Sequence, residues 1–344
     1  MIFESFASAW TMFLIAGFIL AVILGAVVHK TGFCTMGAIS DWVNIGDTGR
    51  WRAWLMAIGV AMIGLAIFEY IDMARPDNAF PGYRNGNLIW MENLLGGLMF
   101  GIGMTFASGC ANKNLVRLGA GNMKSLMVLA IIGVVAYFMV NPFPGTDKTL
   151  FSTLFYPWIR PMAIDLGVSQ DLGALVGGSE NTAISRLIMG LVIGFGLLIY
   201  AFKSAGFRKN SDHWAAGLII GLVILGAWVA TSVIQVEADG ETMALSSYYT
   251  DWDLYADDET GKPSAGAPLS PQSYTFVNPM GQTLGYATVG KASPNFLTFG
   301  IVAVFGVIFG SFLWGLFNKG LRFEWFTTFT DFKNHVMGST LMGF

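Results

Sequence analysis

The sequence predicts an all-α polytopic membrane protein, and its composition and the length of its apolar runs are the observations that predict this. Of its 344 residues, 54% are hydrophobic and only 12% are charged, whereas roughly 25% are charged in soluble domains. A chain with so few charged groups cannot cover a soluble surface. A helix needs roughly 20 mostly apolar residues to cross the hydrocarbon layer of a bilayer, and several stretches approach or reach that length.

Seven apolar stretches are candidates for spanning helices. They are Trp10–Val28, Ala53–Ile71, Leu88–Ala107, Met123–Val140, Leu187–Ala201, Trp214–Val233 and Phe296–Phe317. Phe151–Leu166 is also apolar, but Pro157, Arg160 and Pro161 interrupt it. We therefore expect an interfacial or partly inserted piece there instead of a span.

The order of these stretches predicts three parts of the chain. Residues 1–234 are expected to form a membrane domain, 235–293 an acidic extracytoplasmic loop, and 294–344 a further membrane segment. Near the end, Gly338 and Gly343 repeat the five-residue spacing of Gly96 and Gly101. By the topology below, the two copies enter the membrane from opposite sides, as in an inverted repeat. We therefore expect 294–344 to begin a second repeat that is incomplete.

The orientation follows from lysine and arginine in the short loops, because cytoplasmic loops are the basic ones. Lys203, Arg208 and Lys209 mark one inner loop, and the acidic loop lies one span away. Counting back span by span predicts an extracytoplasmic N-terminus. The formal net charge is only -3, and nothing in its distribution supports nucleic-acid binding.

Two stretches combine glycine, cysteine and small polar residues at membrane depth, Thr31–Ala38 and Ala107–Asn114. Glycine allows a helix to break, and broken backbone persists in a membrane only where protein or a water-filled path satisfies its polar groups. Helices that begin at such breaks offer free N–H groups and partial positive charge to an anion. The candidate residues of an anion path are Gly32, Cys34, Thr35, Gly37, Gly109, Cys110, Asn112 and Lys113.

Cys34 and Cys110 are the two cysteines of the chain. A thiol is a weak donor with a polarizable sulfur, so it can hold a sulfur-bearing ligand loosely enough for conduction. The alternative is that each is a small buried hydrophobe, the commonest state of free cysteine. If both line one path, we expect their sulfurs near the membrane midplane, within about 10–12 Å, the diameter of one helix. We expect them to be too far apart for a disulfide and so to stay reduced.

Charged residues near the span ends have two interpretations. Glu69 and Glu92 are functional candidates because they lie in membrane segments, but solvation at the interface also explains them. Lys113, Arg117 and Lys124 could draw an anion inward, and they also satisfy the positive-inside rule. The three histidines are far apart, and no P-loop, HExxH or CxxC motif occurs. The sequence therefore disfavours an enzyme and ATP-driven transport. It also predicts no cofactor and no metal site.

The two cysteine stretches resemble the YeeE/YedE family of bacterial inner-membrane proteins. The matching residues are Gly32 to Ala38, Gly96, Gly101, Gly109, Cys110 and Gly119 to Ser125. The resemblance implies a multi-pass protein of the inner membrane that takes up thiosulfate or a related small sulfur anion, with Cys34 and Cys110 lining the path. Family members usually carry another Gly-Cys motif after a stretch like Val336 to Phe344. The sequence ends before that position, so it is either part of a longer chain or lacks this third cysteine.

Other functions stay open at this point. The substrate could be another anion or a selenium compound, because Asn112, Lys113 and Asn114 differ from the small and histidine-containing residues usual in thiosulfate carriers. A membrane subunit that docks a cytoplasmic sulfur-carrier protein on its basic inner loops is a second hypothesis. An oxidoreductase subunit that uses the cysteines is a third. Uptake by intact cells separates transport from docking, and an absorbing cofactor would favour the redox function.

Overall fold

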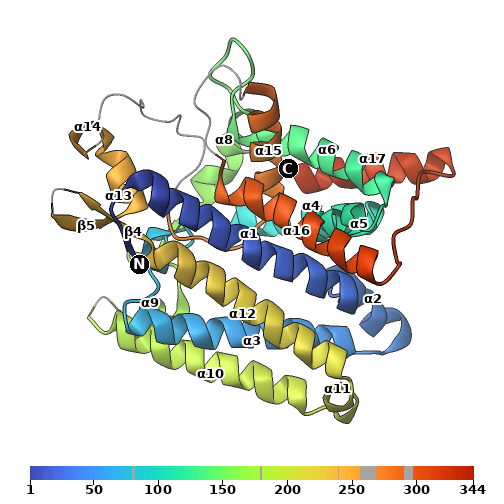
Figure 1. Cartoon of the computed structure of the whole chain (residues 1–344), viewed down its shortest axis with the longest axis horizontal. Coiled ribbons are helices and arrows are strands. Elements are labelled where there is room, and N and C mark those ends of the chain that lie inside the picture. The colour runs from blue at the N-terminus through green and yellow to red at the C-terminus, as the bar shows by residue number, and fades with distance from the viewer. Residues whose placement is uncertain (80–81, 179, 239, 256–268, 290–296) are drawn as a thin grey trace.

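The computed structural model describes the chain except for residues 80–81, 179, 239, 256–268 and 290–296 (Figure 1). Within the described residues, seven helical stretches are long and apolar enough to cross a membrane, as the sequence predicted. They are Phe6–Ile45, Gly49–Tyr70, Trp90–Gly119, Met123–Val140, Thr182–Phe202, Ser211–Val233 and Phe299–Phe317. The all-α membrane architecture is therefore confirmed.

Two of these stretches are divided by a break. The first consists of α1 (Phe6–Thr31) and the shorter α2 (Thr35–Ile45). The third consists of α4 (Trp90–Phe106) and α5 (Ala111–Gly119). The other spans are single helices: α3 (Gly49–Tyr70), α6 (Met123–Val140), α10 (Thr182–Phe202), α12 (Ser211–Val233) and α16 (Phe299–Phe317).

The long helices form neighbouring pairs whose backbones approach closely. Helix α1 packs along α16 and α12, while α3 lies between α12 and α10 (Figure 1). At Gly25 of α1 the backbone of Val307 in α16 lies where a Cβ would be, so only glycine fits there. Small residues that allow such close approach are typical of helix contacts inside membranes, where dispersion forces replace the hydrophobic effect.

The two ends of the bundle differ in structure. At one end lie the N-terminus, the small sheet of β1 (Ile2–Phe3), β4 (Gln235–Ala238) and β5 (Glu241–Ala244), and the short helices α13 (Leu245–Thr250) and α14 (Trp252–Tyr255) (Figure 1). At the other end lie α2 and α11 (Ala205–Lys209), which carry or adjoin basic residues (Figure 1). The sheet pairs β1 with β4 in parallel and β4 with β5 antiparallel.

Several short elements connect the spans. They are η1 (Pro76–Asn78), β2 (Asn87–Leu88), α7 (Leu150–Leu154), α8 (Tyr156–Ile159), η2 (Arg160–Met162), β3 (Ile164–Asp165) and α9 (Leu172–Gly177). The interrupted stretch Phe151–Leu166 is therefore not a spanning helix but a series of short turns, as its prolines predicted.

The segment 235–293 contains two kinds of structure. Its first part forms β4, β5, α13 and α14, whereas its last described part forms α15 (Val277–Val289). Just before α15, Tyr274 and Phe276 pack against the core of the bundle, and the Tyr274 hydroxyl donates to the Gly17 carbonyl at 2.6 Å. The sequence predicts one loop here, because a helix as short as α15 lacks the long apolar run of a span.

The last helix, α17 (Phe329–Gly343), packs across α4 and α6. Gly338 lies directly against the backbone of Gly103 and Ala107. The match of Gly338 with Gly96 concerned sequence spacing alone and predicted no contact between the two stretches. The inverted repeat itself stays a prediction.

The central core surrounds the short helix α5. Leu115 and Val116 of α5 are 0% and 2% exposed, and they pack among apolar side chains of α1, α12 and α16. Burial on this side fixes α5 firmly and leaves its polar residues to face the two breaks.

Candidate functional site

Each of the two breaks ends in a cysteine that begins a short helix. After α1, Gly32 has φ +63° and Cys34 is the N-cap of α2. After α4, Ser108 and Gly109 have φ +59° and +145°, and Cys110 is the N-cap of α5. Glycine adopts positive φ without steric cost, so Gly32 and Gly109 allow the chain to leave the helix, as the sequence predicted. Cys34 lies three residues beyond the end of α1, toward the α2 and α11 end of the bundle.

The side chains of Cys34 and Cys110 face each other as direct interaction partners. The backbone N–H groups of Met36 and Gly37 lie near the sulfur of Cys34, which makes no cap hydrogen bond to them. Those of Asn112 and Lys113 lie near the sulfur of Cys110 in the same way. The expectation that both thiols lie within one helix diameter is confirmed. This contact contradicts the expected separation too large for a disulfide, because the two breaks bring their helix N-termini together, and both cysteines are free in the structure.

Lys113 and Arg117 add positive charge beside the thiols. The Lys113 ammonium group interacts electrostatically with both Cys34 and Cys110. Among the described residues, no carboxylate lies within ion-pair distance of Lys113 or Arg117. A half-buried cation without a carboxylate partner leaves a net positive charge at the site, and this charge favours an anionic ligand.

Two side chains of α5 itself stabilise the second break. The Asn114 amide, 1% exposed, donates to the carbonyls of Gly109 at 3.0 Å, Cys110 at 3.1 Å and Ala107 at 3.5 Å. Arg117 donates to the Ser108 carbonyl at 3.0 Å. These donors replace the helical hydrogen bonds that the break removes, which low-dielectric surroundings require.

A residue of the next spanning helix stabilises the first break. Arg50 at the start of α3 donates to the Gly32 carbonyl at 3.5 Å and forms an ion pair with Asp41 of α2. A Cβ at Gly37 would collide with the Arg50 guanidinium. Gly37 lies inside α2, so the prediction that it breaks the helix is wrong. Its small size instead makes room for Arg50.

Contacts on the far side of α5 attach it to two long helices. The Ser311 hydroxyl of α16 donates to the Val116 carbonyl at 2.6 Å, and His29 Nδ1 of α1 lies 2.9 Å from the same hydroxyl. At Gly119 the α16 backbone lies where a Cβ would be. These contacts hold Cys110 in a fixed position relative to α1, α16 and so to Cys34.

The remaining predicted residues lie around the same thiols. Thr35 is the first residue of α2 and is half-buried. Asn112 is half-buried, and its Oδ1 is a buried acceptor without a hydrogen-bond partner in the described part of the chain. Lys124 lies elsewhere, because it forms a 2.7 Å ion pair with Asp331 at the start of α17. The hydrogen bond from Lys124 lowers the pKa of Asp331, so Lys124 is a structural partner of α17.

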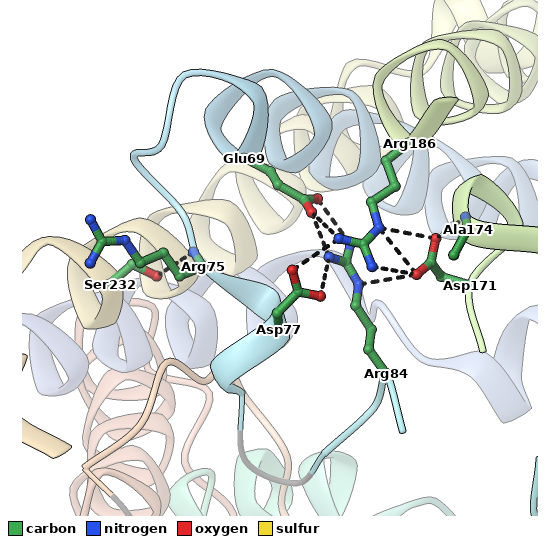
Figure 2. Close-up of polar contacts among 8 residues, drawn as sticks. All are labelled: Glu69, Arg75, Asp77, Arg84, Asp171, Ala174, Arg186 and Ser232. Atoms are coloured by element: carbon green, nitrogen blue, oxygen red, sulfur yellow. Dashed lines mark hydrogen bonds and ion pairs between the residues drawn. The ribbon is translucent and has the colours of Figure 1, made fainter. Parts of the chain in front are cut away.

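A second polar cluster lies at the N-terminal end of the bundle and consists of two arginines and three carboxylates. Figure 2 shows Arg84 and Arg186 between Glu69, Asp77 and Asp171. Arg84 contacts Glu69 at 2.5 Å, and Arg186 contacts Asp171 at 2.8 Å. Burial alone would raise the pKa of Asp171, but hydrogen bonds from Arg186 and the Ala174 backbone lower it.

This cluster corrects the interpretation of the acidic residues as solvated groups. Glu69 is only 16% exposed and is paired with both arginines. Glu92 is 18% exposed and lies 3.4 Å from Arg160. Arg84 and Arg186 are distant from Glu69 in sequence, so no local pattern predicts the pairing. The cluster joins the loop after α3 to α9 and α10 and is far from the thiols along the chain.

Two residues of the thiol site, Arg50 and Asn114, were not predicted from the sequence. Arg50 was not among the candidate residues, and Asn114 appeared only as part of the stretch Ala107–Asn114. One signal for Asn114 was available, since an amide four residues after an N-cap cysteine lies over the preceding break at i, i+4 spacing. Among the described residues, no group of three or more His, Cys, Asp or Glu is arranged to hold a metal ion.

Comparison with known proteins matches the sequence profile of the family described as "Sulphur transport" to residues 30–344. The chain is 29% identical to the thiosulfate transporter TsuA of Escherichia coli K12 over 353 residues, covering 96% of this chain and 82% of that relative. It is 22% identical to the thiosulfate transporter TsuA of Spirochaeta thermophila over 224 residues, covering 64% of this chain and 63% of that relative.

Proposed function

Because the chain belongs to the sulphur transport family, as the resemblance to YeeE/YedE proteins implied, we propose that it carries thiosulfate across the membrane along a path lined by Cys34 and Cys110. The family and its relatives are transporters and not enzymes. One observation supports the path above all. Two helix N-termini meet at a pair of facing thiols, beside a lysine that has no carboxylate partner among the described residues.

The chemistry of the site matches both ends of a thiosulfate ion. The N–H groups of α2 and α5 and the charge of Lys113 attract the sulfonate oxygens. The thiols give the terminal sulfur soft contacts without a full charge. Because neither contact is a close ion pair, binding stays weak enough for release, as conduction requires. Thr35 lies beside this path, as does Asn112, whose Oδ1 has no hydrogen-bond partner among the residues that the structure describes.

Uptake of radiolabelled thiosulfate by intact cells tests the path. We expect Cys110→Ala and Cys34→Ala to reduce uptake by at least about tenfold, equivalent to about 1.4 kcal/mol, at unchanged protein abundance. The serine variants are matched controls, because a hydroxyl keeps the small polar shape but lacks the soft sulfur. Unchanged uptake in all four variants at equal abundance would return the cysteines to the role of buried hydrophobes.

We also propose that the N-terminus is extracytoplasmic. The basic residues of α11 lie at the opposite end of the bundle from β4, β5 and α13 (Figure 1), which agrees with the positive-inside rule. A cysteine introduced at exposed Glu241 in β5, in a background lacking both native cysteines, should react with an impermeant reagent on spheroplasts. Reaction only after permeabilisation would reverse the orientation.

Docking of a cytoplasmic sulfur-carrier protein is compatible with transport. Lys203, Arg208 and Lys209 are exposed at the same end of the bundle as α2, and they offer a basic surface to an acidic partner. If the carrier docks there, charge reversal at all three should weaken its binding and leave uptake into proteoliposomes unchanged. Equal binding by the reversed variant would remove this contact surface.

A further inference from the structure

The two thiols of the path are the two cysteines of the chain, and they lie on separate breaks. Cys34 follows α1, whereas Cys110 follows α4, yet their side chains are direct neighbours. A bond between them would join the α1–α2 break to the α4–α5 break. The chain contains no other cysteine with which either could exchange.

Two features beside the pair assist attack by a thiolate. Thiolates are stabilised at helix N-termini and beside lysine. Cys34 and Cys110 are each the N-cap of a helix, and Lys113 interacts electrostatically with both. Exposure differs, because Cys34 is 7% exposed and Cys110 is half-buried. A reagent that reaches them must therefore be small.

We propose that Cys34 and Cys110 form a redox-reactive pair that small disulfide-type oxidants convert to a disulfide, which closes the path. Polythionate anions are such oxidants, because they contain an S–S bond and carry the same kind of anionic terminal group as thiosulfate. The part of this proposal that concerns closure rests on the thiosulfate path proposed above. The formation of the disulfide does not depend on it.

The reaction with tetrathionate balances in two steps. One cysteine thiolate attacks a sulfur of the central S–S bond, forms a mixed disulfide and expels one thiosulfate with the bonding electron pair. The second thiolate attacks the cysteine sulfur of this mixed disulfide and expels the other thiosulfate. Two thiol protons pass to solvent, both cysteines are oxidised, and tetrathionate is reduced to two thiosulfates.

The disulfide would close the path because of its length. Its sulfur atoms lie about 2.05 Å apart, so no ligand can pass between them. It also fixes the two breaks to each other, while Asn114 and Arg117 hold the second break to α5. Reduction by a small dithiol reverses both effects. High polythionate would thus stop uptake of the reduced anion until the pair is reduced again.

Thiol counting on the purified full chain tests the disulfide without measuring transport. The reduced protein is treated with tetrathionate or, in parallel, with the permeant diazene diamide, then denatured, alkylated and weighed intact. We expect neither cysteine to be alkylated, a mass lower by two hydrogen atoms, and recovery of both thiols after dithiothreitol. In Cys34→Ser and Cys110→Ser, the remaining thiol should keep a tetrathionate-derived adduct or stay free.

Three outcomes would contradict the proposed redox pair. They are alkylation of both cysteines after either oxidant, stable adducts on both cysteines, and cross-linked dimers. A second measurement separates it from the transport proposal. Uptake by wild-type proteoliposomes should be lost on oxidation and recovered on reduction. If the disulfide forms and uptake is unchanged, the path along the thiols and its closure by the disulfide are both contradicted. The redox-reactive pair itself would still be supported. Cysteine-dependent uptake with unreactive thiols would contradict the pair alone.

Discussion

The break at Cys34 and the break at Cys110 both leave backbone carbonyls without helical hydrogen bonds. The donors that replace these bonds come from different parts of the chain. At Cys110, the carbonyls freed by the break bind Asn114 and Arg117 of the helix that follows directly. At Cys34, the corresponding donor is Arg50, which comes from the next spanning helix and is shared with Asp41. The second break is therefore stabilised locally, whereas the first depends on the packing of α2 against α3.

The two breaks also differ in charge. The Arg50 guanidinium is neutralised by Asp41, so the first break adds little net charge. At the second break Lys113 and Arg117 have no carboxylate within ion-pair distance among the described residues. We therefore expect the two breaks to have different roles. The Cys34 break shapes the path, and the Cys110 break supplies the charge that attracts the anion.

Removing the Asn114 amide tests whether its hydrogen bonds stabilise the second break. We expect the largest loss of stability from this change. Asn114→Leu keeps the size of the side chain but leaves the Gly109 and Ala107 carbonyls without their side-chain donor. A buried polar group without a partner costs about 1–3 kcal/mol, so we expect a loss of about 2–6 kcal/mol, seen as a lower Tm in detergent and low abundance in the membrane.

The matched control for this change is Asn44→Leu. Asn44 is exposed in α2, where its amide donates to Ser40, and exposed substitutions usually change stability by less than about 0.5 kcal/mol. Equal Tm values for the two variants would show that Asn114 is not what holds the second break.

The sequence could predict the spans and the two breaks, because both are local features. Apolar run length marks the spans, and glycine beside cysteine marks each break. The donors that hold the breaks are harder to predict. Arg50 looks like any other basic residue of an inner loop, and its pairing with Gly32 depends on how α3 packs. Glu69 likewise finds Arg186 only after α3 and α10 come together.

The segment around α15 shows a second limit of sequence reasoning. An apolar run of about 20 residues is the signal for a span, and α15 has only 13 residues. Tyr274 nevertheless packs against α1, where its hydroxyl binds the Gly17 carbonyl. Because such a segment is both polar and short, the same residues fit a surface loop equally well. Only tertiary contacts distinguish the two.

The contrast in charge predicts different behaviour for the two arginines. Arg50→Ala leaves Asp41, which is 19% exposed, without its partner, so we expect a loss of stability of about 1–3 kcal/mol. Adding Asp41→Asn should restore much of it. Arg117→Ala leaves no carboxylate unpaired, so we expect a smaller fall in Tm but a higher KM for thiosulfate uptake. Thermal unfolding and uptake kinetics measure the two effects separately.

This double-mutant comparison has a clear contrary outcome. If Asp41→Asn fails to rescue Arg50→Ala, the role of Arg50 lies in its bond to the Gly32 carbonyl and not in the ion pair. If Arg50→Ala raises KM as much as Arg117→Ala does, with equal stability, the division of roles between the breaks is wrong.

Substitutions at the glycines of the two breaks should have the smallest effects on stability, and they compare the two breaks at single positions. At Gly32 a Cβ would meet open space, and only the φ of +63° opposes a side chain. The left-handed conformation costs an ordinary residue about 1–2 kcal/mol, and asparagine tolerates it better. At Gly109 the φ is +145°, and a Cβ would lie 2.9 Å from Lys113 Cγ. We therefore expect Gly109→Ala to lower Tm more than Gly32→Ala, and Gly32→Asn to lower it least.

Because the Gly109 change also displaces Lys113, it should reduce thiosulfate uptake beyond its effect on abundance, whereas Gly32→Asn should not. Equal uptake per molecule in these variants would mean that the position of Lys113 does not matter for the anion.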